Sequence, residues 1–274
     1  MLKQRVITAL VLLGLLIPAL LASDARWFAL LTLAFIGAAG WEWMRLNGTA
    51  GGPAVALGVA LAAACGAALA AGWTQRPPTA GWALAALAWV LGGALALRAG
   101  VAGWPRLPRA LRGVLGLVLL WLAWLALAQA RALGLNFILS VFCLVWMADS
   151  AAYFGGRRFG RRKLAPAISP GKSWEGAVSG LIGVLVLALV WLALDTERSS
   201  LYGRLVAAHG PALLVAGVLL LVAMSVVGDL FESLVKRAAG AKDSSALLPG
   251  HGGVLDRIDA LLPVFPIALA LAAL

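Results

Sequence analysis

The sequence predicts an all-α, polytopic integral membrane protein with about nine transmembrane helices. Hydrophobic residues make up 63% of the 274 residues, whereas charged residues make up only 12%. A soluble domain carries about 25% charged residues, so this composition cannot coat a water-facing surface and excludes a soluble globular protein. Long apolar segments also recur along the whole chain, each near the length of about 20 residues that one membrane crossing needs.

Nine such segments are separated by polar, glycine-containing or proline-containing breaks such as Ser23-Asp24 and Trp104-Pro105-Arg106. The expected spans are 6–22, 27–46, 53–73, 80–97, 113–130, 135–155, 176–194, 211–231 and 258–274. The first segment also resembles a signal peptide, because Lys3 and Arg5 precede its apolar stretch. Eight further spans favour a retained helix.

The distribution of the 22 Lys and Arg residues predicts the topology. If the N-terminus is cytoplasmic and the sides alternate, most of these residues fall on the cytoplasmic side, as the positive-inside rule requires. The C-terminus, after nine crossings, is then expected outside. The net charge of +11 therefore reflects a bilayer partner. Nucleic acid is not an expected partner, because no RNP, zinc-finger or helix-turn-helix pattern is present.

The first half of the chain carries few polar residues inside its spans. Glu42 lies between Trp41 and Trp43 near the cytoplasmic end of the second span. An intramembrane acid is often functional, but an interfacial position favours a structural role here. The twelve tryptophans, often near span ends, are expected at the membrane interface, and His209 is expected to be a solvated residue of an outer loop.

A basic segment follows the sixth span. It contains six cations interleaved with Gly, Ser and Pro: Arg157, Arg158, Arg161, Arg162, Lys163 and Lys172. Such a segment suits an anionic ligand, although a polybasic loop that touches lipid headgroups would look similar. The acids at its two ends weigh against a role in orientation alone. The candidate substrate-binding residues in this region are Asp149, Arg158, Lys163, Ser169, Lys172, Ser173 and Glu175.

The Gly171-Lys172-Ser173 triplet is not a phosphate-binding P-loop. The full motif needs another glycine five residues earlier, and Pro166 stands there. The motif also needs a βαβ unit, which a membrane loop does not offer.

Residues 228–259 carry a second group of charges. Asp229, Glu232 and Lys236 are spaced i, i+3 and i+7, so a helix places them on one face. Asp256 and Asp259 have the same i, i+3 relation at the start of the ninth span. Two helix ends that offer carboxylates supply the oxygen ligands that hard cations prefer.

The loop between these helix ends contains four glycines and His251, which offer backbone donors for phosphate groups. Salt bridges to Lys236, Arg237 and Arg257 are the alternative explanation for the acids. An acid at membrane depth costs roughly 2.5–3.5 kcal/mol, so a functional role is favoured. The pattern predicts a metal–phosphate site on one face of the membrane.

The stretch from Ser233 to Asp259 resembles the signature of the CDP-diacylglycerol synthase family, also called phosphatidate cytidylyltransferase. It reads Ser-x-x-Lys-Arg, then Lys-Asp after four residues, then Pro-x-His-Gly-Gly-x-x-Asp-Arg-x-Asp. Ser245 stands where many members carry glycine. The run from Asp149 to Gly176 is similar to the other cytoplasmic motif of the family. The resemblance covers about 110 residues and rests on hydropathy alone over the first half.

The resemblance implies that CTP and phosphatidic acid react to give CDP-diacylglycerol and pyrophosphate with Mg²⁺, and it leaves a second cation open. It implies in-line attack of the lipid phosphate on the α-phosphorus of CTP at the cytoplasmic face of a bacterial inner membrane, and a homodimer. Residues 1–132 are then structural, and residues 133–274 form the catalytic region with motif loops 156–175 and 232–257.

The residue roles follow from the same resemblance. The expected catalytic residues are Asp229, Lys236, Asp243, His251, Asp256 and Asp259, of which Asp229, Asp256 and Asp259 are the expected metal ligands. Further expected substrate contacts are Ser233, Arg237, Lys242, Gly252, Gly253 and Arg257.

Two other classes of membrane protein also carry charged residues in or beside their spans. A membrane transporter of an anionic substrate should show two related halves, and here the motifs lie in one half. A CDP-alcohol phosphotransferase should carry Asp-Gly-x-x-Ala-Arg, which this sequence lacks.

Overall fold

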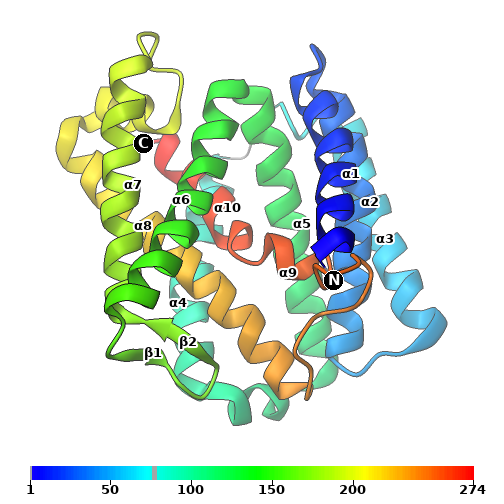
Figure 1. Cartoon of the computed structure of the whole chain (residues 1–274). Helices are drawn as coiled ribbons and strands as arrows, with labels where there is room; N and C mark the ends of the chain where they lie inside the picture. The colour runs from blue at the N-terminus through cyan, green and yellow to red at the C-terminus, as the bar shows by residue number, and fades with distance from the viewer. Residues whose placement is uncertain (1, 76–78) are drawn as a thin grey trace.

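The computed structural model describes residues 2–75 and 79–274 and forms a bundle of helices (Figure 1). The first half consists of α1 (Leu2–Leu21), α2 (Ala25–Leu46), α3 (Gly51–Ala70), α4 (Thr79–Gly103), the 3-10 helix η1 (Trp104–Arg106) and α5 (Arg109–Leu133). The second half consists of α6 (Leu135–Phe159), β1 (Lys163–Ala165), β2 (Ser169–Ser173), α7 (Trp174–Leu194), α8 (Leu201–Ala238), α9 (Leu255–Ile258) and α10 (Leu261–Ala272). The predicted helical class is confirmed, with one small hairpin added.

Within the described residues, eight helices, α1 to α8, are long and apolar enough to cross a membrane. The chain is therefore a multi-pass membrane protein, as its composition predicts. The ninth expected span, 258–274, is wrong as a single crossing helix, because the chain divides it into α9 and α10. α10 has 12 residues, about 18 Å at 1.5 Å per residue, whereas the hydrocarbon core is about 30 Å thick.

α10 is an interior helix of the bundle. Every residue from Leu262 to Leu269 is buried, and the helix packs against α4, α5, α6 and α8. Figure 1 shows it in the middle of the molecule. A protein interior and a bilayer both select apolar side chains, so hydropathy alone could not distinguish them. The outside position of the C-terminus depended on nine crossings, and it stays a prediction.

The hairpin β1–β2 joins α6 to α7 at one end of the bundle (Figure 1). It is antiparallel, with Lys163 opposite Ser173 and Ala165 opposite Ser169. Ser173 then begins α7 by accepting a hydrogen bond from the backbone N–H of Gly176 at 3.2 Å, a standard N-cap. The segment predicted as loop 156–175 is thus an ordered structure.

α8 is kinked and longer than the predicted span. His209 and Gly210 have non-helical dihedral angles ahead of Pro211, and Gly210 has φ 72°. His209 therefore lies in this kink and not in an outer loop. At its other end α8 continues to Ala238, so residues Asp229 to Arg237 are helical and the second motif loop narrows to 239–254.

Candidate functional site

Lys236 is the centre of a buried ion-pair cluster near the end of α8. Its Nζ lies 2.5 Å from Oδ1 of Asp256, and it also pairs with Glu232 one turn earlier on the helix. Glu232 is only 1% exposed. Because an unpaired charge is costly to bury, each of these three groups depends on the others.

Asp256 connects this cluster to the loop 239–254. Its Oδ2 accepts hydrogen bonds from the backbone N–H of Ser244 at 2.9 Å, the Ser244 hydroxyl at 2.9 Å and the N–H of Gly253 at 2.7 Å. Burial disfavours the charged form, but these hydrogen bonds and Lys236 lower the pKa of Asp256 to about 2. Asp256 is therefore a carboxylate that folds the loop back onto α8.

A second ion pair joins the hairpin to α8. Nζ of Lys172, on β2, lies 2.6 Å from Oδ2 of Asp229, on α8. The Ser233 hydroxyl donates to Oδ1 of Asp229 at 3.3 Å. Asp149, on α6, interacts electrostatically with both Lys172 and Asp229. Residues from the two separate sequence motifs thus meet at one place.

Asp259 links the two clusters, because it interacts electrostatically with Asp229, Lys236 and Lys172. Close backbone packing produces this arrangement. A Cβ atom on Gly228 would lie 2.5 Å from the carbonyl oxygen of Asp259, so only glycine lets α8 approach the turn between α9 and α10 this closely. Asp229 is the next residue of α8, which brings its carboxylate toward Asp259.

The chemistry of these groups fits Mg²⁺, although no three His, Cys, Asp or Glu side chains are arranged as a metal site in the part of the chain that the structure describes. Carboxylate oxygens are the ligands that Mg²⁺ takes from proteins. Both oxygens of Glu232 are buried and accept no well-formed hydrogen bond. Of the three predicted ligands, Asp229 and Asp259 interact electrostatically. Protein donors occupy both oxygens of Asp256 and, through Lys172 and Ser233, both oxygens of Asp229.

The other predicted residues of the basic segment shape the hairpin. Glu175 accepts hydrogen bonds from the N–H groups of Arg161 at 3.0 Å and Arg162 at 3.2 Å, which fixes the turn into β1. Lys163 and Ser169 lie on the paired strands. Arg158 is exposed, and its guanidinium lies 5.6 Å from the ring centre of Phe159.

The remaining predicted residues of the second motif lie in different environments. Arg237 ties the hairpin to α8, because its Nε–H donates to the carbonyl oxygen of Ile168 at 3.4 Å. Lys242 and Asp243 are exposed, and Gly252 has φ 82°. His251 is half-buried, and its Nδ1 has no hydrogen-bond partner among the described residues. Arg257 lines an apolar cavity of about 260 Å³ beside α1, away from the two lysine clusters.

Glu42 has the structural role that the sequence favoured, but its burial and its hydrogen-bond partners were not predicted. It is fully buried on α2. Its Oε1 accepts from the Ser245 hydroxyl at 2.5 Å and the Val254 N–H at 3.0 Å. Its Oε2 accepts from the Ser244 hydroxyl at 3.1 Å and the Leu255 N–H at 2.7 Å. The signal was an acid inside an apolar span, but its partners lie about 200 residues further along the chain.

Gly253 lies between these carboxylates. A Cβ atom at this position would collide with the Ser244 hydroxyl and with Oε1 of Glu42. Its N–H also donates to Asp256. Gly253 therefore belongs to the framework that holds the loop 239–254 between Glu42 and Asp256.

Comparison with known proteins shows the family of this chain. The cytidylyltransferase family matches residues 3–274. A phosphatidate cytidylyltransferase of Pseudomonas aeruginosa is 42% identical over 277 aligned residues, which cover 99% of this chain and 97% of that protein. The phosphatidate cytidylyltransferase of Haemophilus influenzae is 55% identical over 133 residues, 48% of this chain and 44% of that protein. The one from Brucella suis is 47% identical over 129 residues, 47% and 44% of the two chains.

Proposed function

Because this chain belongs to the cytidylyltransferase family and is a homologue of phosphatidate cytidylyltransferase, we propose that it joins CTP and phosphatidic acid. The products are CDP-diacylglycerol and pyrophosphate, a nucleotidyl transfer in phospholipid biosynthesis. The observation that carries the proposal is the 42% identity over 99% of the chain. The geometry supports it, because both substrates are polyanions and two lysines meet among carboxylates at one end of α8.

Lys172 and Lys236 are the proposed phosphate-binding groups. Each is paired with a carboxylate, Lys172 with Asp229 and Lys236 with Asp256. Ammonium groups bind phosphate through charge-assisted hydrogen bonds, so substrate oxygens would compete with these carboxylates. Arg237, which bridges α8 and the hairpin, is placed to add a third cation. Of the more exposed groups, His251 is proposed to position a phosphate, and Asp243 to orient Lys242.

The attacking phosphate needs no strong general base, because it is already largely ionised near neutral pH. The proposed step is in-line attack on the α-phosphorus of CTP. Bound Mg²⁺ would neutralise charge that develops toward the pyrophosphate leaving group. Asp229 and Asp259 are the residues that would hold it, whereas Asp256, the third ligand expected from the sequence, would instead hold the loop 239–254.

Metal binding can be measured without turnover. We expect Asp229→Asn and Asp259→Asn to weaken binding of Mn²⁺, as a spectroscopic substitute for Mg²⁺, at least about tenfold in magnetic-resonance titrations. Asp256→Asn should leave Mn²⁺ affinity nearly unchanged while it reduces thermal stability. Equal loss of Mn²⁺ affinity in all three variants would make Asp256 a direct ligand.

The active site is proposed to face the cytoplasm, where CTP is found. The hairpin and the loop 239–254 lie toward the same end of the bundle in Figure 1. A reporter near Arg161 should then be cytoplasmic, and one fused after Leu274 should lie on the opposite side. The proposed homodimer is tested by the mass of the purified protein measured by light scattering in detergent.

The decisive assay is CDP-diacylglycerol formation from labelled CTP, phosphatidic acid and Mg²⁺ by purified protein. Lys172→Ala should raise the KM for a substrate without preventing membrane insertion. Arg106→Ala, which removes an exposed cation at η1, is the matched control. Movement of an anion across liposomes without formation of any CDP-lipid would favour the transporter over the enzyme.

A further inference from the structure

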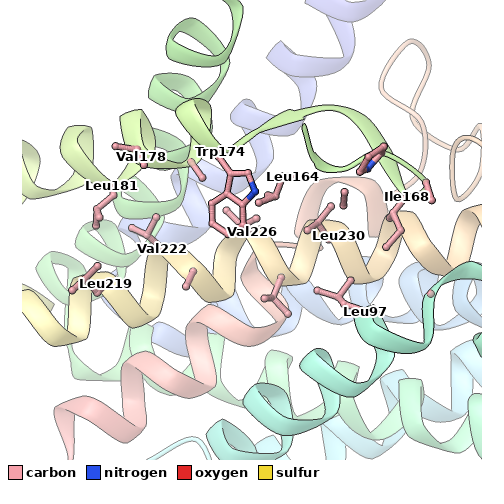
Figure 2. A pocket seen from close by; sticks show the side chains of 17 residues that line it. Leu97, Leu164, Ile168, Trp174, Val178, Leu181, Leu219, Val222, Val226 and Leu230 are labelled. Carbon is pink, nitrogen blue, oxygen red and sulfur yellow. The ribbon is translucent and has the colours of Figure 1, made fainter. Parts of the chain in front are cut away.

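An apolar groove lies beside the charged site. Its volume is about 640 Å³, and its walls come from α4, the hairpin, α7 and α8 (Figure 2). The side chains that line it are almost all aliphatic, and Figure 2 shows Trp174 lying across its middle. The volume falls in the range of about 300–1,000 Å³ that is usual for ligand sites. The groove is therefore large enough to hold part of a substrate.

The α8 wall of the groove is a continuous helical face. Leu219, Val222, Val226 and Leu230 recur every three or four residues and all line the groove. Ser233 and Arg237 are the next positions at this spacing, and both belong to the charged site. The face thus changes from apolar to polar along one line. A molecule that lies along it would have one long apolar part and one polar end.

The polar end of the groove meets the groups already assigned to phosphate. Leu230 follows Asp229, the partner of Lys172. Ile168 lines the groove, and its carbonyl oxygen accepts a hydrogen bond from Arg237. Charged groups of both signs are therefore concentrated at one end of an otherwise apolar surface, and the cations among them are the groups that an anionic head would contact.

The other side of the groove opens toward the outer surface of α7. Trp174 and Val178 are 54% and 53% exposed. They also form one wall of a neighbouring hollow of about 670 Å³, which Arg162 and Lys163 line as well. A lipid can therefore enter from the apolar surface of the bundle and pass cations on its way to the site.

We propose that this groove binds one acyl chain of the phosphatidate substrate while the lipid phosphate lies at Lys172 and Lys236. The proposal rests on the proposed function. The chain passes from one apolar medium, the bilayer or micelle, to another, so little hydrophobic transfer free energy is gained, and the steric fit of the chain in the groove decides how the lipid is held. The catalytic groups do not touch the chain, so the groove should affect KM and not kcat.

Kinetics with two lipids test this assignment. Ala223→Trp on α8 and Ala177→Trp on α7 place a large side chain in the groove. We expect each variant to raise the KM for dioleoyl phosphatidate at least about tenfold, because the indole ring occupies space that the chain needs. Its kcat and its KM for CTP should stay within about twofold of wild type, and its KM for dihexanoyl phosphatidate should not change. Val186→Trp, at a position of α7 that is 55% exposed outside the groove, is the matched control.

Photo-crosslinking provides a readout that does not require turnover. Phosphatidate with a diazirine at the end of one acyl chain should label residues 219–230 of α8 in wild type and not in Ala223→Trp. Unlabelled dioleoyl phosphatidate should suppress this labelling, whereas phosphatidylcholine should not. Equal competition by phosphatidylcholine, or the same KM for dioleoyl phosphatidate in Ala223→Trp and Val186→Trp, would mean that bulk lipid fills the groove and would overturn the proposal.

The two hypotheses fail differently. If wild type forms no CDP-lipid from either phosphatidate, the proposed reaction is wrong, and the crosslinking result still decides whether the groove binds this lipid. If wild type is active but labelling falls elsewhere, only the groove assignment is wrong.

Discussion

Replacement of Glu42 by glutamine tests whether α2 holds the loop 239–254 in the position that the proposed reaction needs. Each carboxylate oxygen accepts one serine hydroxyl and one backbone N–H, with all four distances between 2.5 and 3.1 Å. An amide has the same shape but only one acceptor oxygen. Whichever way it is oriented, its NH₂ group faces either the Val254 or the Leu255 N–H, so one buried donor loses its acceptor.

An unsatisfied buried donor costs about 1–3 kcal/mol. If the loop relieves this cost by moving, Ser244 and Asp256 move with it. We expect Glu42→Gln to lower kcat about 5- to 150-fold, the factor equivalent to that free energy, with a smaller effect on KM. The assay is Mg²⁺-dependent formation of CDP-diacylglycerol, together with thermal unfolding in detergent.

A double-mutant cycle separates positioning from a general loss of stability. The Ser244 hydroxyl is within hydrogen-bonding distance of both Glu42 and Asp256, and its single proton can serve only one of them at a time. Ser244→Ala combined with Glu42→Gln should therefore lose less activity than the sum of the single effects. Additive losses, or normal kcat in Glu42→Gln, would refute the proposed coupling between α2 and the loop.

Three further predictions concern the same framework. Gly253→Ala should reduce kcat/KM at least about tenfold, because the added methyl group displaces Glu42 and Ser244. The control is Gly52→Ala on α3, which should change neither activity nor melting temperature, because nothing lies within 4 Å of an added Cβ there. Lys236→Met should destabilise the protein by about 3–5 kcal/mol, since it leaves the buried Glu232 without a partner and removes the cation beside Asp256. Adding Glu232→Gln should restore part of the stability in thermal melts but no activity. The pKa of Asp256 is about 2 instead of 3.8, so its charged form stabilises the folded protein above pH 3.8, and this stabilisation is lost as the pH falls towards 2. The melting-temperature difference between wild type and Asp256→Asn should therefore be constant from about pH 8 to 5 and shrink below about pH 4. A constant difference down to about pH 3 would contradict this.

The sequence predicted the long helices and the helical faces, because apolar length and residue spacing define them directly. The eight long helices follow from apolar length, and the shared face of Asp229 and Lys236 follows from helical spacing, which α8 confirms. The hairpin was missed because strands of 3 and 5 residues, one of them with Pro170, carry no periodic signal. Salt bridges were the alternative explanation for the acids of residues 228–259, and Lys236 does pair with Glu232 and Asp256.

Hydropathy failed where the protein interior and the bilayer look alike. Trp43 and Trp104, which were expected at the membrane interface, are buried within the bundle, and their depth in the bilayer stays a prediction. Their indole N–H groups donate to the carbonyl oxygen of Arg112 at 2.9 Å and to Asn47 at 3.0 Å. The partners of Glu42 were missed for a related reason, because no local pattern links an acid in one helix to a loop so far away in sequence.

The contact between Glu42 and the loop also has a consequence for biogenesis. α2 is synthesised long before residues 244–255, so Glu42 enters the membrane with none of its four donors available. An unpartnered acid in a nascent helix is held there at a cost, and local water or protonation must satisfy it until α8 and α9 have been made. The arrival of the loop on α2 is then a late step of maturation, and a chain that lacks this loop should leave α2 poorly anchored and open to membrane quality-control proteases.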